Sequence, residues 1–327
     1  MRKYLFILLI LFTLPFREGT GLGLSATTVE REQQFKYYWY AAKQAIQDER
    51  YDDALVLLEF CEALNPTDGT TLESLGVIYN ALRQEEKALD YWRRAFEAAP
   101  RDQWYRYSAA LLDRKNDADR KAALRVMQTA YRAQQPDVEE ALLEQLLRLY
   151  MSEERWKEAI RTQDEIDRLK GYDAYSAYYR MRAYALWGKP KKALAEIDKY
   201  LEEDPTNVQF LLYRIDIMSH AGAKPKELFA QYERILEITP YDLMVLNNYA
   251  YLLATHGGDL NKAEKMSQLT IQKEPNNPVY LDTYGWILHL QGQEQLAAFY
   301  LYRAWQNATD ETREEIGRHL QKIKTDK

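Results

Sequence analysis

Residues 69–102 read GTTLESLGVIYNALRQEEKALDYWRRAFEAAPRD, and this stretch decides the fold. Its first half repeats apolar or small residues at i, i+3, i+4 and i+7, which is the spacing of one face of an amphipathic helix. These residues are Leu72, Leu75, Gly76 and Tyr79. Because Gly76 has no side chain, a neighbouring helix can approach its backbone closely. We therefore expect a helix that packs tightly against a partner.

The second half of the same stretch predicts that partner. Residues 83–85 are polar and form a turn, and apolar positions then return at helical spacing. They are Ala88, Trp92, Ala95 and Phe96. Pro100 ends the second helix, because proline disfavours the helical conformation of the residue before it.

Prolines repeat this pattern along the chain. Pro66 and Pro100 lie 34 residues apart, and Pro205, Pro240 and Pro275 follow one another at intervals of 35. A fixed period of a few tens of residues predicts a stacked-repeat architecture. Two residues after each proline stands an Asp or Asn that can cap the next helix by accepting backbone N–H bonds. These are Asp68, Asp102, Asn207, Asp242 and Asn277.

The combined pattern resembles the tetratricopeptide repeat, a unit of two antiparallel helices in 34 residues. The resemblance rests on Leu-x-x-Leu-Gly-x-x-Tyr at residues 72–79, on Ala88 and Ala95, and on the closing Pro100. It covers residues 35–310 and implies an all-α fold, a right-handed superhelical solenoid of about eight helix-turn-helix units. Several glycines fall at the turn inside their units, where a left-handed residue ends the first helix. They are Gly188, Gly222, Gly257 and Gly292.

This pattern divides the chain into four parts. Residues 1–26 form a leader, 27–136 an N-terminal repeat block, 137–310 a C-terminal repeat block, and 311–327 a capping helix and tail. The third unit is degenerate, because Ala123 and Ala130 fit only after the insertion of one residue and the closing proline has moved to Pro136. The polar helix at 311–324 would cover the open end of the last unit, as terminal repeats require.

Composition excludes some classes of protein. The chain has 13 glycines and 10 prolines in 327 residues, too few turn residues for a β-sandwich. Its net charge is −6, and no basic stripe of the kind that nucleic-acid binders carry is visible. We therefore expect no nucleic-acid partner.

The N-terminus reads as an export signal. Arg2 and Lys3 precede an apolar segment, residues 4–16, which is too short to span a bilayer comfortably but suits a secretory leader. Residues 24–26, Leu-Ser-Ala, offer a cleavage site. The alternative is an uncleaved N-terminal anchor. The only cysteine, Cys61, lies at a small-residue helix position, so we expect it to be buried and unpaired.

The sequence holds no motif for catalysis or for a cofactor. Phosphate loops, His-Glu-x-x-His, Gly-x-Ser-x-Gly and Cys-x-x-Cys pairs are all missing from it. One weak alternative involves His220, His256 and His289, which close the first helix of three successive units and could together hold zinc. Units about 10 Å apart do not meet the geometry of a metal site, so we expect no cofactor and no enzyme activity.

Aromatic residues suggest where a partner binds. In the tetratricopeptide family the first helix of each unit lines the concave face, and its second, fifth and ninth positions point there. Side chains of Tyr, Trp and Arg supply much of the binding energy at interfaces. The matching residues here are Lys36, Trp39, Lys43, Trp104, Tyr107, Tyr175, Tyr178, Arg182, Phe210 and Tyr213. The alternative for each ring is packing between units.

These observations predict an exported bacterial protein, periplasmic or secreted, that binds a protein or peptide as an adaptor or assembly factor of the cell envelope. Trp39 and Glu73 stand where the family's clamp for C-terminal carboxylates would begin, which disfavours a chaperone-tail receptor. Two alternatives remain: a membrane-tethered regulator that keeps its N-terminal helix, and a metal-binding or hydrolytic protein that uses the C-terminal histidines.

Overall fold

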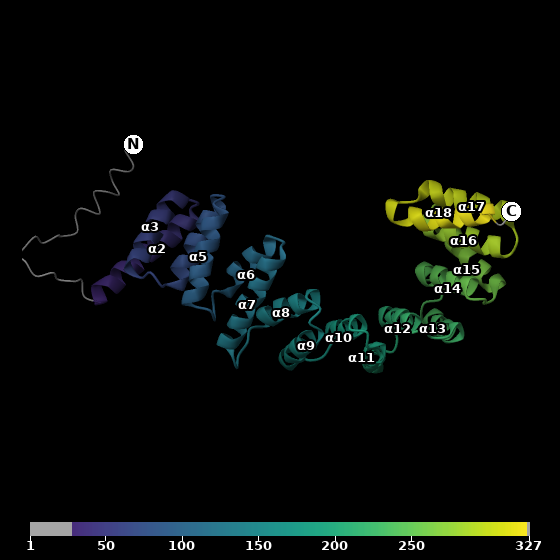
Figure 1. The fold of residues 1–327 in the computed structure, drawn as a ribbon, viewed down its shortest axis with the longest axis horizontal. Helices are drawn as coiled ribbons and strands as arrows, with labels where there is room; N and C mark the ends of the chain where they lie inside the picture. Colours follow the sequence, from purple (N-terminus) through teal and green to yellow (C-terminus); the bar gives the residue numbers. More distant parts are fainter. Residues whose placement is uncertain (1–27, 326–327) are drawn as a thin grey trace, which may run out of the picture. The chain divides into compact units, whose positions relative to one another are not determined.

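The structure, a computed structural model, describes residues 28–325. Within this range it has 17 helices and no strand, so the predicted all-α fold is confirmed. The helices form eight consecutive pairs, and a single helix follows them (Figure 1). We call the two members of each pair the first and the second helix. The predicted leader, residues 1–26, lies outside the described residues.

The chain divides into two compact units, Met1–Val138 and Glu139–Lys327. The helices of the first unit are α2 (Thr28–Gln47), α3 (Tyr51–Leu64), α4 (Gly69–Ala81), α5 (Glu85–Ala98), α6 (Trp104–Asp113) and α7 (Asp117–Gln134). Those of the second are α8 (Glu140–Ser152), α9 (Trp156–Lys170), α10 (Ala174–Leu186), α11 (Pro190–Glu203), α12 (Val208–His220), α13 (Pro225–Ile238), α14 (Leu243–Thr255), α15 (Leu260–Lys273), α16 (Pro278–Leu290), α17 (Glu294–Asn307) and α18 (Asp310–Thr325).

The pair α4/α5 shows why the repeat needs a glycine. A Cβ on Gly76 would collide with the indole of Trp92 on α5, so only glycine lets the two helices approach this closely. The indole Nε1–H of Trp92 donates to the carbonyl of Glu73 on α4, at 3.3 Å. The same arrangement recurs in α16/α17, where a Cβ on Gly285 would meet Leu301 Cγ at 2.7 Å.

Every pair has one left-handed residue in the turn between its helices. In the second unit the predicted glycines take this role, with φ of 70° at Gly188, 80° at Gly222, 71° at Gly257 and 77° at Gly292. In the other four pairs the turn residue is not glycine. These residues are Glu49, Arg83, Lys115 and Glu154, with φ between 54° and 60°.

Side-chain caps begin four of the first helices as predicted. The caps accept backbone N–H bonds of the first turn, and they are Asp68, Asn207, Asp242 and Asn277. The predicted cap Asp102 is wrong, because α6 begins only at Trp104 and the residue before it, Gln103, makes no side-chain cap bond.

The degenerate third unit still forms a complete helix pair. Its first helix, α6, has 10 residues and its second, α7, has 18. Ala123 and Ala130 are fully buried on α7, where the two helices cross. The irregular spacing of this unit is therefore absorbed by a short first helix and a long second one.

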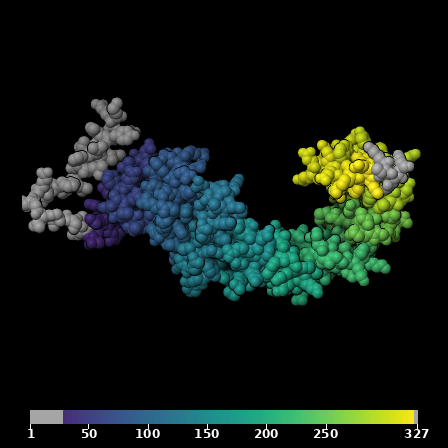
Figure 2. Space-filling view, in the orientation of Figure 1, coloured from purple at the N-terminus to yellow at the C-terminus, as the bar shows by residue number. Residues whose placement is uncertain are grey.

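The single helix α18 covers the end of α16 and α17. Ile316 and Ile323 are buried there, and His319 Nδ1 lies 2.8 Å from a carboxylate oxygen of Asp282 on α16. In the space-filling view α16, α17 and α18 form one packed surface (Figure 2, green to yellow). None of the helices α2–α18 is both long and apolar enough to cross a bilayer.

Candidate protein-binding surface

The predicted binding residues all lie on first helices. Lys36, Trp39 and Lys43 are on α2, Trp104 and Tyr107 on α6, Tyr175, Tyr178 and Arg182 on α10, and Phe210 and Tyr213 on α12. Their burial differs widely, and this difference decides which of them a partner can reach.

Trp39 and Lys43 line a shallow groove between α2 and α4, with a volume of about 220 Å³. The Lys43 ammonium lies 5.9 Å from the centre of the Trp39 ring, within reach of a cation–π contact. Thr70 and Ser74 form the opposite wall of the groove on α4. Lys36 is exposed and binds Glu32 of the same helix at 2.6 Å, so part of its charge is already compensated. The groove can therefore hold a small apolar group next to one cation.

The second unit has a more extended aromatic surface on α10 and α12, which we call the tyrosine ladder. It runs from Tyr175 to Tyr179 (ring centres 4.4 Å apart), from Tyr179 to Tyr178 (5.5 Å) and from Tyr178 to Tyr213 (5.6 Å). Tyr175 is exposed, whereas the other three rings are half-buried. Two neighbouring first helices thus bring their aromatic residues into contact.

Polar groups at the tyrosine ladder can form hydrogen bonds in defined directions. Arg182 donates a hydrogen bond of 2.8 Å to the hydroxyl of Tyr178, with its guanidinium carbon 5.9 Å from the ring centre. Burial raises the pKa of Tyr175 to about 12, and a hydrogen bond with Tyr179 contributes. The Tyr175 hydroxyl is therefore protonated at neutral pH and can donate a hydrogen bond. A second exposed guanidinium, that of Arg148 on α8, hydrogen-bonds Tyr175. Flat rings, hydroxyl groups and two exposed guanidinium groups suit recognition by contact.

Two of the predicted binding residues are core residues instead. Trp104 is 2% exposed and packs edge-on against Tyr105 at 5.6 Å. Phe210 is 4% exposed and lies 4.1 Å from the ring of Tyr200 on α11. Each stands in the first turn of its helix and is too deeply buried for a partner to reach. We therefore withdraw both from the binding surface.

Tyr107 lies between these two classes. It is half-buried, and its ring centre is 6.0 Å from that of Phe96 on α5.

Sequence reasoning also missed one residue of the ladder, Tyr179. Its signal was its place four residues after Tyr175, which puts both rings on one face of α10. The partners Thr70 and Ser74 carried no signal, because small hydroxyl side chains are common on helix surfaces.

The histidines do not come together as a metal site. His220 contacts Asp216 one turn earlier, His256 contacts Thr255, and His289 Nδ1 lies 3.0 Å from Glu294. Across residues 28–325 no group of three or more His, Cys, Asp or Glu residues could hold a metal ion. The alternative of a metal-binding or hydrolytic protein based on these histidines therefore gains no support.

Cys61 is fully buried as expected, and burial with the charge of Asp68 raises its pKa to about 11.

Known structures share this fold. No family model matches the sequence, and no curated protein does. A chain of the complex of Naa15 and Naa10 bound to HypK-THB matches with a TM-score of 0.59 at 15% identity, over 88% of this chain and 46% of that one. This protein thus spans about half the length of that chain. The C-terminal part of a tetratricopeptide repeat protein from Cytophaga hutchinsonii matches with a TM-score of 0.52 at 18% identity, over 76% and 98%.

Proposed function

We propose that this chain, which has the tetratricopeptide-repeat fold, is a non-catalytic scaffold that binds a protein or peptide at the tyrosine ladder of α10 and α12. The observation that carries the proposal is the contact of Tyr178 with Tyr213 across two first helices, with Tyr175 open to solvent. Aromatic side chains that stay accessible offer a large contact area at a small loss of conformational entropy.

The ladder suits a polypeptide partner. Its rings provide flat apolar area, its hydroxyls can pair with backbone carbonyls, and Arg182 offers a charge-assisted bond to a carboxylate or a carbonyl. The similar chain in the Naa15 complex belongs to an assembly of several proteins. The role proposed here is binding by surface complementarity, and it needs no chemical step.

The test compares ladder variants with an exposed tyrosine elsewhere. Wild-type protein, Tyr178→Ala, Tyr213→Ala and Tyr241→Ala are used to isolate partners from a cell-envelope extract, and the recovered partner is then titrated against each protein. Tyr241 is 78% exposed and lies outside the ladder, which makes it a matched control. We expect each ladder variant to weaken binding by roughly 2 kcal/mol, as loss of a hot-spot residue does, and the control to bind normally.

The result is informative only if the variants fold. Loss of a fully buried aromatic side chain costs about 3–5 kcal/mol of stability, and the half-buried rings of the ladder should cost less. If Tyr178→Ala and Tyr213→Ala unfold the protein while binding per folded molecule is unchanged, the rings are core and the ladder is not the site.

We further propose that the protein works in a bacterial cell envelope as an adaptor or assembly factor. The basis is the leader at residues 1–26, with Arg2 and Lys3 ahead of an apolar segment. Mass spectrometry of protein expressed with its leader distinguishes the alternatives: a mature N-terminus near Thr27 supports export with cleavage, and one at Met1 in the membrane fraction supports the tethered regulator. Full-length protein that is soluble in the cytoplasm contradicts both.

A further inference from the structure

The second helix of the last pair, α17, exposes an unusual number of large apolar side chains. Leu296, Phe299, Tyr302 and Trp305 follow one another at intervals of three residues and are 50%, 54%, 57% and 37% exposed. We call them the α17 stripe. Grouped apolar exposure of this kind marks an interaction site more often than it marks an ordinary surface.

Other second helices do not share this feature. The helices α17, α15 and α5 can be aligned at a fully buried alanine, which is Ala297, Ala263 and Ala88 in turn. The four positions that match the α17 stripe carry mostly charged or polar residues elsewhere. They are Lys262, Lys265, Gln268 and Ile271 on α15, and Lys87, Asp90, Arg93 and Phe96 on α5. The packing of the repeat therefore does not require an apolar stripe at these positions.

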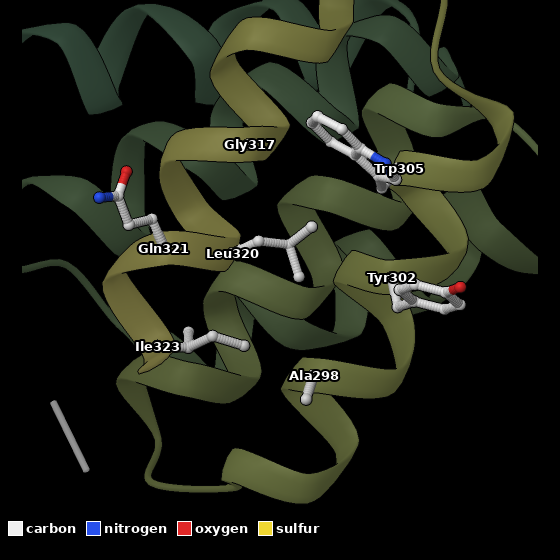
Figure 3. A pocket seen from close by; sticks show the side chains of 7 residues that line it. All are labelled: Ala298, Tyr302, Trp305, Gly317, Leu320, Gln321 and Ile323. Atoms are coloured by element: carbon white, nitrogen blue, oxygen red, sulfur yellow. The ribbon is translucent and has the colours of Figure 1, made fainter. Parts of the chain in front are cut away.

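The stripe borders a groove between α17 and α18 with a volume of about 620 Å³. Tyr302 and Trp305 belong to both the stripe and the groove, and Ala298 lies at its other end (Figure 3). On α18, Leu320 points into the space between the two helices, and Gly317 leaves room beside the Trp305 ring.

The preceding pair shows what normally fills such a place. Ile271 on α15, which matches Trp305, packs against the cluster formed by Tyr284 and Leu288 of α16 and Ala297 of α17. A first and a second helix together cover it. Beside Trp305, α18 takes the place of the first helix. Its Leu320 stands at the same helix position as Leu288 on α16. No later helix among the described residues supplies the second, and the groove is open on that side.

The charges of α18 indicate where this helix comes from. Its first half exposes Asp310, Glu311, Glu314 and Glu315 and a single cation, Arg313, which lies 3.8 Å from Asp310; its second half exposes Arg318 and Lys322. A two-fold axis perpendicular to α18 places a second α18 antiparallel to it. The acidic half of each helix would then face the basic half of the other. The helix dipole favours the same order of charges. The charges therefore favour a second α18 as the occupant, and the exposed α17 stripe indicates that the groove is an interaction site.

We propose that the groove between α17 and α18 is occupied by α18 of a second copy of this chain, in a two-fold symmetric dimer. This surface is separate from the tyrosine ladder, so the dimer and the proposed partner binding can fail independently. The contact buries Tyr302 and Trp305, aromatic residues of the type that dominates interface energies.

Sedimentation equilibrium of the full chain tests the proposal. We expect a reversible dimer, and Tyr302→Glu should raise its dissociation constant on the order of tenfold or more, as loss of a hot-spot aromatic residue does. Tyr241→Glu, at an exposed tyrosine outside the stripe, should leave the dissociation constant unchanged. Circular dichroism checks that both variants are folded. A monomeric wild-type chain overturns the proposal, and so does a dimer that both substitutions affect equally.

Charge reversal tests whether two copies of α18 face each other. One variant carries Glu311→Lys with Glu314→Lys, and the other carries Arg318→Glu with Lys322→Glu. Each alone should dimerise weakly, because like charges then face each other at both ends. A mixture of the two should form the heterodimer, because every contact is again between opposite charges. If the mixture stays monomeric, or if a different protein occupies the groove of a monomeric chain, the second copy is the wrong occupant.

Discussion

Gly76 on α4 and Gly317 on α18 are both the eighth residue of a first helix, but their surroundings differ. Gly76 is buried beneath Trp92, which comes from the second helix of its own pair. Gly317 has no second helix after it in the described chain, and its neighbour is Trp305 from the pair before. The same helix position is therefore core in a complete pair and the floor of a groove in an incomplete one. Five experiments can break or sharpen this comparison.

The two tryptophans should give the largest difference. Trp92 is 8% exposed, so Trp92→Ala should lower the free energy of unfolding by about 3–5 kcal/mol. Trp305 is 37% exposed, and Trp305→Ala should cost about 1 kcal/mol or less at concentrations where the chain is monomeric. Urea unfolding followed by circular dichroism measures both. Equal losses would show that the last pair is as closed as the others.

The next-largest effect should come from the buried pair of His319 and Asp282, which joins α18 to α16. His319→Ala leaves the Asp282 carboxylate without its partner, and breaking a buried pair costs about 3 kcal/mol or more. Here the loss should be local, so hydrogen exchange of α18 amides should rise while that of α4 and α5 is unchanged. If exchange rises evenly along the chain, α18 is not a separately docked helix.

That variant should also respond to pH. Burial raises the pKa of Asp282, while the hydrogen bond and charge of His319 oppose the rise. A carboxyl with a raised pKa binds its proton more tightly in the folded state than in the unfolded state, so its contribution to stability falls as pH increases. The deficit of His319→Ala should therefore shrink as pH is lowered from neutral toward about 4, the ordinary aspartate value. A deficit that does not change with pH contradicts this account.

The two glycines should differ by a smaller amount. Gly76→Val inserts methyl groups into the Trp92 ring, and overpacking of this kind costs about 1–3 kcal/mol. A Cβ at Gly317 would lie 2.9 Å from Trp305 Cζ3, but that ring is partly exposed and can move away. Gly317→Val should thus destabilise the monomer by less than Gly76→Val, and thermal unfolding of the two variants decides the matter.

The smallest effect on the monomer should come from the stripe itself. Tyr302 is 57% exposed, so Tyr302→Glu should change the unfolding free energy by only about 0.5 kcal/mol. This is the reverse of its expected effect on the dimer. If the substitution destabilises the isolated chain strongly, Tyr302 is part of the core, and the comparison between closed and open pairs is lost.

The fold could be predicted from the repeat period of the sequence, because Gly76, Ala88 and the repeating prolines mark contacts that form inside one repeat. The glycine turns and the burial of Cys61 followed from the same local logic. Arg83 and Glu154 at left-handed turns could not be recognised, since their types favour helices and only the surrounding pair forces the conformation.

The candidate site was less predictable, because exposure depends on neighbours outside the repeat. Trp104 and Tyr178 both fit the binding pattern, but loops and helices cover only the first. The α17 stripe was missed for a related reason. Its residues are apolar, and the sequence does not show which apolar side chains of a helix its neighbours leave uncovered.

The left-handed turns also bear on the order in which the chain folds. A residue other than glycine loses roughly 1–2 kcal/mol in this conformation, and all three pairs of the first unit have such a residue, at Glu49, Arg83 and Lys115. Four of the five pairs in the second unit use glycine instead. Repeat proteins can nucleate at any unit and propagate from there, so nucleation should favour the hairpins with glycine turns. On a ribosome this protein would then complete its easiest hairpins last, leaving its earlier helices longest without a stable neighbour.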